Sequence, residues 1–365
     1  MATRLAYGAS RMKLIIQIPC FNEESQLPAT LADLPREVDG FDSVEWLVVD
    51  DGSSDRTLEV AREHGVDHIV RLTNHKGLAA AFQAGLDACM KLGADVIVNT
   101  DADNQYDARD IPKLVEPVLS GRADMVVGDR SVHSVEDFSP LKKRLQRIGS
   151  AIVRRASETE IPDTTSGFRA YNREAAIQVQ VVSRFTYTLE SIIQAGKGLV
   201  AIDHTPIRTN AKTRESRLFG SMASYVRRGA VSIFRIYALY EPLRVFMMAA
   251  FVLGLGALVL WGRFLWFLIV EGNGSGHVQS VILGAVLFLA AIQLAALGVV
   301  GDILAGSRVL QQRVLERVRR VELHLGVAPS HYEPGEGGRA DTQGTTGAGS
   351  APATGGDGGR EALKL

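Results

Sequence analysis

Cysteine is scarce in this chain, which has only Cys20 and Cys89 among its 365 residues. Two isolated cysteines form neither a disulfide framework nor a cysteine-based metal site, and we expect buried thiols in a reducing compartment. Neither sign of charge is in excess, because the formal net charge is −1, so bulk charge gives no argument for a nucleic-acid partner. The first dozen residues contain no apolar run and predict no signal peptide.

Two phosphate-binding motifs are also absent. No G-x-G-x-x-G follows the first predicted strand, and no G-x-x-x-x-G-K-[ST] occurs anywhere in the chain. Dinucleotide oxidoreductases and P-loop NTPases bind phosphate with those glycine-rich loops, so the sequence favours neither class. A nucleotide bound by this chain would be held by carboxylates and a metal ion instead.

Short apolar runs alternate with helical patterns through residues 13–208. We predict strands at residues 14–18, 46–49, 69–72, 96–98 and 125–127. We predict helices that begin at residues 22–24, that cover 56–64 after a cap at Ser54 or Asp55, and that cover 77–92. This alternation indicates an α/β fold with a mainly parallel, doubly wound sheet, in which ligands bind beyond the carboxyl ends of the strands. The polar residues at those predicted ends are Asp50, Asp51, Asp101, Asp103, Asp129 and Arg130.

An acidic pair, Asp101 and Asp103, follows the apolar run at residues 96–98. Mg²⁺ and Mn²⁺ prefer oxygen ligands, and Mg²⁺ is usually held by one or two carboxylates together with substrate phosphates. If this segment is extended, alternation of side chains would place Gln105 on the same side as both aspartates, as a third oxygen ligand. A lone D-x-D is a weak signal because acidic pairs are common at loop tips, so its companion motifs decide its meaning.

Five motifs occur in order: PCFNEE at residues 19–24, VVDDGSSD at 48–55, KG at 76–77, DAD at 101–103 and TSGFR at 165–169. As an ordered set over residues 13–218, they resemble the family 2 inverting glycosyltransferases with the Rossmann-like GT-A fold. The most similar branch includes dolichyl-phosphate mannose synthase and bactoprenyl-phosphate glucosyltransferase. One departure lies at residues 214–218, where RESRL replaces the GESKL stretch common in that branch, which keeps the basic character and loses the glycine.

The resemblance implies where the donor would bind. It assigns the nucleotide-sugar to Pro19, Phe21, Glu23, Asp50, Asp51, Lys76, Asp101 and Ala102. A cation, Mg²⁺ or Mn²⁺, would bind at Asp101, Asp103 and Gln105 and stabilise the departing diphosphate. Two of these assignments have non-functional alternatives. Residues 50–52 would then form a plain turn, and Lys76 would be a solvated loop lysine.

Arginine suits an acceptor phosphate because its planar fork matches phosphate oxygens. Arg130 and Arg144 are predicted to grip that phosphate and to complete the catalytic set with Asp101 and Asp103. The other acceptor contacts predicted from the resemblance are Ser166, Arg169, Ser216 and Arg217. A solvated basic helix face explains Arg144 about equally well, and an ion pair with an acid is the alternative for Arg169.

Two apolar stretches, residues 245–270 and 278–305, each exceed the roughly 20 residues that span a bilayer. The connector at residues 271–277 lacks Lys and Arg, whereas arginines flank the outer ends of both stretches. The positive-inside rule therefore predicts an integral plasma-membrane protein whose catalytic domain is cytoplasmic. The alternative is a buried hairpin of helices within a large globular domain.

The expected divisions are a tail at residues 1–12, the GT-A domain at 13–215, amphipathic interfacial helices at 216–243, two transmembrane helices at 244–305, a basic amphipathic helix at 306–326 and a disordered tail at 327–365. Disorder is expected at the end because Gly, Ala, Thr and Pro dominate there. Within the basic helix, an apolar stripe consists of Leu310, Val314, Val318, Val321 and Leu325. It would bind the membrane surface or pair with a second subunit in a homo-oligomer, and the sequence leaves both open.

The predicted activity is transfer of one sugar, with inversion, from a GDP-mannose or UDP-hexose type donor to a polyprenyl phosphate such as dolichyl or undecaprenyl phosphate. No general base is assigned, because an acceptor phosphate is already ionised at neutral pH. A hydroxyl acceptor on a glycan or glycolipid is the alternative, and Asp129 would then be the first base to test. The intact Asp101, Asp103 and Gln105 argue against a non-catalytic scaffold, and the absence of Gln-x-x-Arg-Trp disfavours a processive synthase.

Overall fold

The computed structural model describes residues 11–130, 159–181, 187–198, 200–210, 240–270 and 277–335, with single residues between and beyond these ranges. Its centre is an eight-stranded sheet in the order β7-β5-β6-β4-β1-β2-β3-β8. The strands are β1 Lys13–Cys20, β2 Ser43–Asp50, β3 His68–Arg71, β4 Val96–Asn99, β5 Met125–Asp129, β6 Arg169–Asn172, β7 Ile202–Pro206 and β8 Tyr332–Pro334. The helices around the sheet are α1 Leu27–Asp33, α2 Thr57–Glu63, α3 Leu78–Lys91, α4 Ile111–Leu119, α6 Arg173–Gln178 and α7 Thr188–Lys197.

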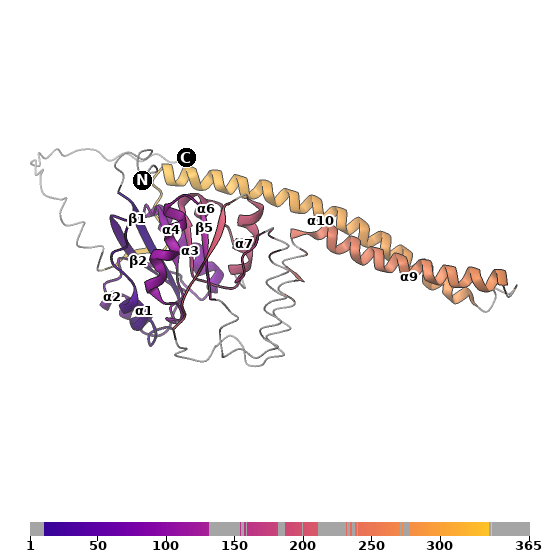
Figure 1. Ribbon diagram of the computed structural model, residues 1–365, viewed down its shortest axis with the longest axis horizontal. Coiled ribbons are helices and arrows are strands. Elements are labelled where there is room, and N and C mark those ends of the chain that lie inside the picture. Colours follow the sequence, from indigo (N-terminus) through magenta and orange to yellow (C-terminus); the bar gives the residue numbers. More distant parts are fainter. Residues whose placement is uncertain are drawn as a thin grey trace, which may run out of the picture.

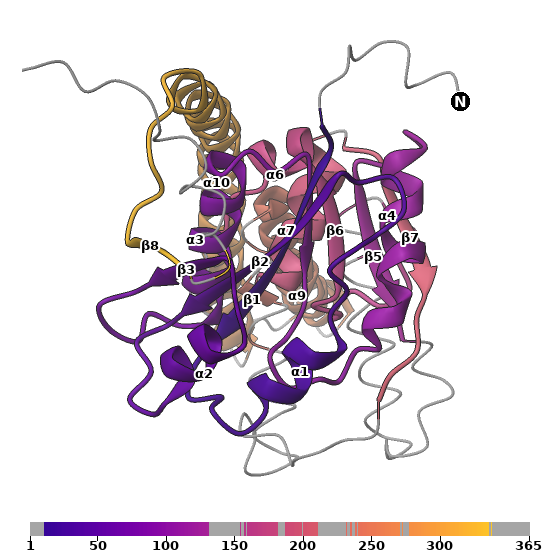
Figure 2. The ribbon, with the colours of Figure 1, turned by 90° about the vertical axis from the view of Figure 1, so that its left-hand side faces the viewer.

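Helices cover both faces of the sheet (Figures 1 and 2). α1, α2 and α4 supply one core cluster with side chains such as Leu31, Ala61 and Leu114. α3, α6 and α7 supply the other cluster, which includes Phe82 and Ile192. Both clusters also draw on the strands, because successive side chains of a strand point to opposite faces. Only β6 and β8 pair antiparallel to their neighbours, so the predicted GT-A fold class with a mainly parallel sheet is confirmed.

The parallel strands bring their carboxyl ends to one edge of the sheet. Cys20 at the end of β1 is opposite Asp50 at the end of β2, and Asp50 is opposite Arg71 at the end of β3. β4 and β5 both pair antiparallel with β6 and therefore run in the same direction. Asp101 and Arg130 follow the ends of these two strands, so the polar residues predicted for this edge do lie there.

The five predicted strands and the helices at residues 56–64 and 77–92 correspond to β1 to β5, α2 and α3, with small shifts in their ends. The helix predicted to begin at residues 22–24 is an error, because α1 begins at Leu27. Asn22 has a φ of +54°, which no helix tolerates, and its side-chain oxygen accepts from the backbone N–H of Ser54 at 2.8 Å. Asn22 therefore bonds to the loop after β2, and no helical turn forms at residues 22–24. Sequence patterns did not predict β6 or β7.

Two long helices form a hairpin that projects from the sheet domain (Figure 1). α9 Pro242–Val270 and α10 Val278–His324 have mean hydropathies of 2.3 and 2.4 over their most apolar windows, and only 11% and 17% of those windows is buried. Such exposed apolar helices are long enough to cross a bilayer, and they are not the core helices of a globular domain. The predicted basic helix at residues 306–326 is not a separate element, because α10 continues through it without a break for 47 residues.

The carboxyl half of α10 lies on the sheet domain beside α3 and α6 (Figure 2). Arg319 donates to the backbone carbonyls of Ile177 and Val179 at 2.8 and 2.9 Å. Arg320 pairs with Glu174, and Glu322 pairs with Lys91 at 3.2 Å. The hairpin is therefore fixed to the domain by hydrogen bonds and ion pairs at the far end of α10.

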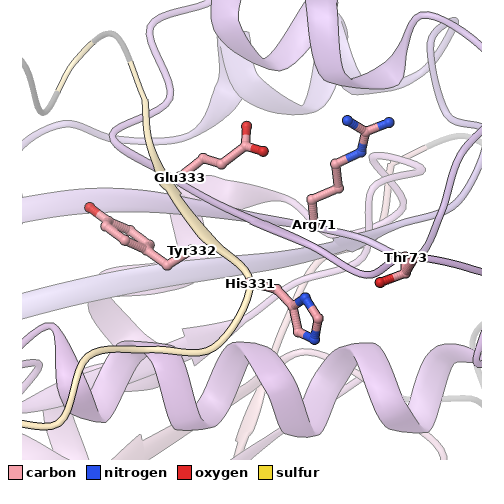
Figure 3. Close-up of a pocket in the computed structure, with 5 residues that line it drawn as sticks. All are labelled: Arg71, Thr73, His331, Tyr332 and Glu333. Carbon is pink, nitrogen blue, oxygen red and sulfur yellow. The ribbon is translucent and has the colours of Figure 1, made fainter. Parts of the chain in front are cut away.

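The chain after α10 returns to the sheet as β8, which pairs with the outer strand β3. The expectation that residues 327–365 are disordered is wrong for residues 327–335. Figure 3 shows His331, Tyr332 and Glu333 beside Arg71 and Thr73, around a shallow pocket at this edge. The Tyr332 hydroxyl lies 3.0 Å from Nδ1 of His68, and Glu333 pairs with Arg62 at 2.8 Å. Backbone pairing to an open sheet edge orders a segment whose composition predicts disorder.

Candidate functional site

Asp101 and Asp103 lie just beyond β4, at the edge where the parallel strands end. Burial and the neighbouring Asp103 charge raise the pKa of Asp101 to about 7, against the opposing influence of Arg130. Two carboxylates whose charges conflict in a partly buried site are the arrangement that a divalent cation relieves.

The backbone of Gly167 fixes the position of Asp101. A methyl group at Gly167 would lie 2.9 and 3.0 Å from the Asp101 carboxylate oxygens and 2.7 Å from the Tyr187 hydroxyl. The N–H of Gly167 donates to the Tyr106 hydroxyl at 2.9 Å. The TSGFR motif thus contributes a glycine because only a residue without Cβ allows the loop to approach the carboxylate this closely.

A buried amide network lies below this contact. The Gln17 amide donates to Asn99 Oδ1 at 2.9 Å, and Asn99 Nδ2 donates to the Gly167 carbonyl at 2.8 Å and to the Tyr187 hydroxyl at 3.0 Å. Gln17 and Asn99 are fully buried. Neither these residues nor Tyr106 and Tyr187 were predicted from the sequence. The available signal was an amide side chain inside each of two otherwise apolar strands, since buried amides require partners.

Gln105 lies beside Asp103, although the geometry predicted for this segment is wrong. Residues 101–105 form a turn in which Asn104 has a φ of +53°, so side chains do not alternate as in a strand. The Gln105 side-chain amide donates to Asp103 Oδ2 at 2.7 Å. The contact is consistent with a supporting role for Gln105 in orienting Asp103, and its role as a metal ligand stays a prediction.

Arg130 already has an acidic partner. Its Nε and Nη2 donate to the Asp163 carboxylate at 2.7 and 3.1 Å, and Nη2 also donates to Thr165 Oγ1 at 2.8 Å. The Arg130 charge and hydrogen bonds hold the pKa of Asp163 below its usual range although burial opposes them. The predicted grip on an acceptor phosphate would therefore require Arg130 to share its guanidinium with this pair. Asp163, the partner of Arg130, was not predicted from the sequence.

Arg169 is enclosed and cannot contact an acceptor directly, which corrects its predicted role. Its guanidinium donates to the Ser166 and Thr164 carbonyls at 2.8 and 3.1 Å and to Ser191 Oγ at 2.6 Å, and the residue is fully buried. The predicted alternative, an ion pair with an acid, is not what these bonds show. Arg169 instead holds residues 164–166 in place. Ser166 is also fully buried, and its hydroxyl has no hydrogen-bond partner.

The donor half of the predicted site is built on Asp50 and Asp51, both buried. Asp51 accepts from the backbone N–H groups of Lys76 and Gly77, each at 2.8 Å, and lies 2.8 Å from Nδ1 of His75. Asp50 accepts from the Ser53 N–H through one oxygen, and its other oxygen is buried without a partner. Asp51 thus fixes the loop after β3, whereas Asp50 keeps acceptor capacity.

Phe21 and Glu23 lie in the loop after β1, and Pro19 lies within β1. The Phe21 ring stacks on His75 with 3.9 Å between centroids. Glu23 N–H donates to Thr57 Oγ1 and Glu24 N–H to Asp55, so this loop is joined to the loop after β2. Lys76 is exposed, and Ala102 is buried with its carbonyl accepting from Thr30. Three predicted residues, Arg144, Ser216 and Arg217, lie outside the described residues.

Comparison with known proteins identifies the family. The model of glycosyl transferase family 2 matches residues 15–179. Dolichol-phosphate mannosyltransferase of Pyrococcus furiosus is 30% identical over 72% of this chain and 74% of that protein. Dolichyl-phosphate hexose transferase of Haloferax volcanii is 32% identical over 56% of this chain and 86% of that protein. The chain is a family 2 glycosyltransferase.

A third relative of this glycosyltransferase, undecaprenyl-phosphate mannosyltransferase of Micrococcus luteus, is 29% identical over 64% of this chain and 98% of that protein. The family match begins in β1 and ends just after α6. It therefore contains the acidic pair, the buried amides Gln17 and Asn99, and Gly167, whereas Tyr187 lies beyond it. α9, α10 and β8 of this glycosyltransferase lie outside that match.

Proposed function

We propose that this glycosyltransferase moves a single hexose from a nucleotide-diphosphate sugar to a polyprenyl phosphate at the cytoplasmic face of the membrane. The observation that supports this proposal is that one chain combines an acidic sheet edge with an exposed apolar hairpin. The acidic edge of the sheet offers a donor site, and the exposed apolar hairpin would anchor the domain that carries this edge to a lipid surface. The names of the three relatives, all transferases of dolichyl or undecaprenyl phosphate, favour the same acceptor class.

The donor would enter along the carboxyl ends of β1, β2 and β4. The unpartnered oxygen of Asp50 is suited to accept from a base N–H or a ribose hydroxyl, since a buried acceptor without a partner is costly. The loop held by Asp51 brings the backbone of Lys76 to the same edge. Pro19, Phe21 and Glu23 would border the base.

Mg²⁺ or Mn²⁺ would be held by Asp101 and Asp103, with Gln105 beside them. Among the described residues, no three acidic, His or Cys side chains converge on a metal site, so donor phosphates would supply the remaining ligands. Such a cation would neutralise the charge of the departing diphosphate. The raised pKa of Asp101 is in keeping with this assignment, because burial and the neighbouring Asp103 charge both disfavour its ionised form, and a cation would offset both.

The reaction would be an in-line displacement. An acceptor phosphate oxygen attacks the anomeric carbon, the bond from that carbon to the diphosphate oxygen breaks, and the configuration inverts. The protein's task is to orient the two substrates, since an ionised phosphate needs no general base. Arg130, backed by Asp163, follows β5 at the same edge and is an acceptor-side candidate, together with Arg144, Ser216 and Arg217. Ser166 is as fully buried as Arg169 and is not proposed as an acceptor contact.

The test is a transfer assay with purified enzyme, MgCl₂ or MnCl₂, radiolabelled GDP- and UDP-sugars, and undecaprenyl or dolichyl phosphate. We expect one labelled, organic-extractable and acid-labile product whose formation stops with EDTA. Transfer only to hydroxyl-bearing lipids or glycans would overturn the acceptor assignment, and no transfer from any donor would overturn the proposal.

Asp103→Asn tests the acidic pair directly. We expect turnover to fall by about 10²-fold or more, the scale of losing one electrostatic contact to the transition state. Glu59→Gln, at an exposed carboxylate on α2, is the matched control and should keep full activity. Circular dichroism of both variants checks folding, and an active Asp103→Asn would contradict the role of the pair.

A further inference from the structure

The carboxyl half of α10 has an apolar face without a partner among the described residues. Leu310, Val314, Val318, Val321 and Leu325 form this α10 stripe, and each is between 46% and 71% exposed. A monomeric soluble surface seldom keeps a continuous row of this kind. We therefore expect the stripe to be covered by another apolar surface.

The sheet domain cannot supply that surface, because it contacts the opposite side of the helix. At 100° per residue, Arg319 and Leu323 project together, and the stripe is centred about 140° or more away from them. Arg319 bonds to the backbone after α6, and Leu323 packs against the second core cluster. Figure 1 shows the sheet domain on one side of α10 only.

The bilayer is a poor candidate for a geometric reason. α10 is continuous from its apolar half into its basic half, and Figure 1 shows both halves on one line. With a rise of 1.5 Å per residue, Val318 lies about 20 Å and Leu325 about 30 Å beyond residue 305 along the helix. If the hairpin crosses the membrane, the stripe projects away from the membrane surface.

The spacing fits a helix of the same kind. From Val314 the stripe advances by four, three and four residues, which puts Val318 and Leu325 at a positions and Val314 and Val321 at d positions of a heptad. Two copies inserted in one bilayer with the same topology are related by an axis along the membrane normal, so their α10 helices run parallel. Membrane topology thus excludes the antiparallel pairing that a soluble helix could adopt.

Charge in the flanking positions agrees with parallel pairing. In a parallel coiled coil, a residue at g meets the residue five positions later, at e, of the other helix. Arg317 is at g, and the residue at e five positions later is Glu322, which also pairs with Lys91 of its own domain at 3.2 Å. Leu310 at g and Leu315 at e would form a second, apolar pair of this kind, and Leu315 is 40% exposed.

We propose that the α10 stripe binds the same stripe of a second copy of this chain, forming a parallel two-helix interface above the membrane. The interface places two sheet domains on opposite sides of a central helix pair. Each domain keeps its own acidic edge, so the proposal is independent of the sugar and the acceptor.

Disulfide trapping of the full chain in membranes tests the pairing. The native thiols Cys20 and Cys89 are buried, so an introduced surface cysteine is the reactive one. We expect Val318→Cys or Val321→Cys to give a covalent dimer on mild oxidation. Arg313→Cys, at an exposed c position of the same helix, is the matched control and should stay monomeric. Equal trapping at all three positions, or none at any, would overturn the proposal.

Charge exchange tests the register. Arg317→Glu should raise the dimer dissociation constant about tenfold by placing like charges together, measured by mass photometry in nanodiscs. Adding Glu322→Arg should restore dimerisation, although it also removes the contact with Lys91 within one copy. A double variant as weak as the single one would count against this register.

A lipid quencher distinguishes a second copy from the bilayer. A fluorophore on Val318→Cys should be insensitive to spin-labelled lipids if the stripe binds a second copy. Quenching equal to that of a label within residues 281–300 would show insertion into the bilayer and would overturn the proposal.

Discussion

The Asp101 carboxylate is held where its charge is unfavourable. The Gly167 backbone and Asp103 crowd it, and the Gln17 and Asn99 amides fix the loop that carries Gly167. Each buried polar atom of that network has a partner, so the loop has little freedom to relax. At the scale of single residues, this fixed geometry supports the proposed cation at Asp101.

The raised pKa of Asp101 predicts pH-dependent metal binding. The folded protein keeps a proton on Asp101 that the unfolded chain loses near pH 4, so the stability contributed by this group falls as the pH rises from about 4 to about 7 and changes no further above that. A cation must displace that proton. We expect Mn²⁺ affinity, measured by calorimetry, to be about tenfold higher at pH 8 than at pH 6. Equal affinity at both pH values would contradict this account.

Gly167→Ala tests the close approach of the loop. A methyl group would meet two carboxylate oxygens and a hydroxyl at 3.0 Å or less, so Asp101 or the loop must shift. We expect activity to fall by about 10²-fold and stability by about 1–3 kcal/mol. Gly306→Ala is the control, because nothing lies within 4 Å of the added methyl group there. Unchanged activity of Gly167→Ala would show that Asp101 need not lie against this backbone.

At the scale of elements, short loops and one terminal strand fix the sheet edges. The loops after β1 and β2 are joined by side-chain caps from Asn22, Ser53 and Asp55. β8 covers the outer edge at β3, where unpaired backbone groups would otherwise be exposed. The chain that leaves α10 therefore continues into β8, which pairs with β3, and the loop after β3 is the one that Asp51 holds.

Two truncations separate β8 from the rest of the tail. A chain that ends after Val327 loses β8 and the contacts of Tyr332 and Glu333. We expect its unfolding free energy to fall by about 1–3 kcal/mol and its tendency to aggregate to rise. A chain that ends after Gly337 keeps β8 and is the control. Equal denaturant midpoints for the two would show that β8 contributes no stability.

At the scale of the whole molecule, the shape combines a compact sheet domain with an elongated hairpin (Figure 1). The apolar residues of the hairpin are exposed, whereas those of the domain are enclosed in two clusters. This division assigns the two parts to different surroundings, one aqueous and one lipid.

The orientation in the membrane is testable at the tip of the hairpin. Arginines lie at the outer ends of α9 and α10, so we expect a reporter inserted after Gly272 to be outside the cytoplasm. Alkaline phosphatase fused there should be active, and a fusion after Gly337 should be inactive. The reverse pattern would place the sheet domain on the opposite side of the membrane.

The sequence alone determined the class of fold, five strands and the identity of the acidic edge. Apolar runs bounded by polar turns specify parallel strands, and consecutive strand ends of one direction must share an edge. The sequence also favoured an exposed hairpin, because each apolar stretch is long enough to span a bilayer. Only the structure excluded the alternative of a buried hairpin, because just 11% and 17% of the apolar windows of α9 and α10 are buried.

Only the tertiary structure decided which partners the polar residues take. Arg169 turned inward, Arg130 paired with Asp163, and Tyr332 joined β3, and each of these contacts joins segments that are distant in sequence or divided by loops. The spacing of apolar residues along the sequence indicates which side chains are buried. The partner of an arginine depends instead on which distant segments lie beside it in the folded chain. For this reason the Asp101 site was predictable as a location, and its supporting network was not.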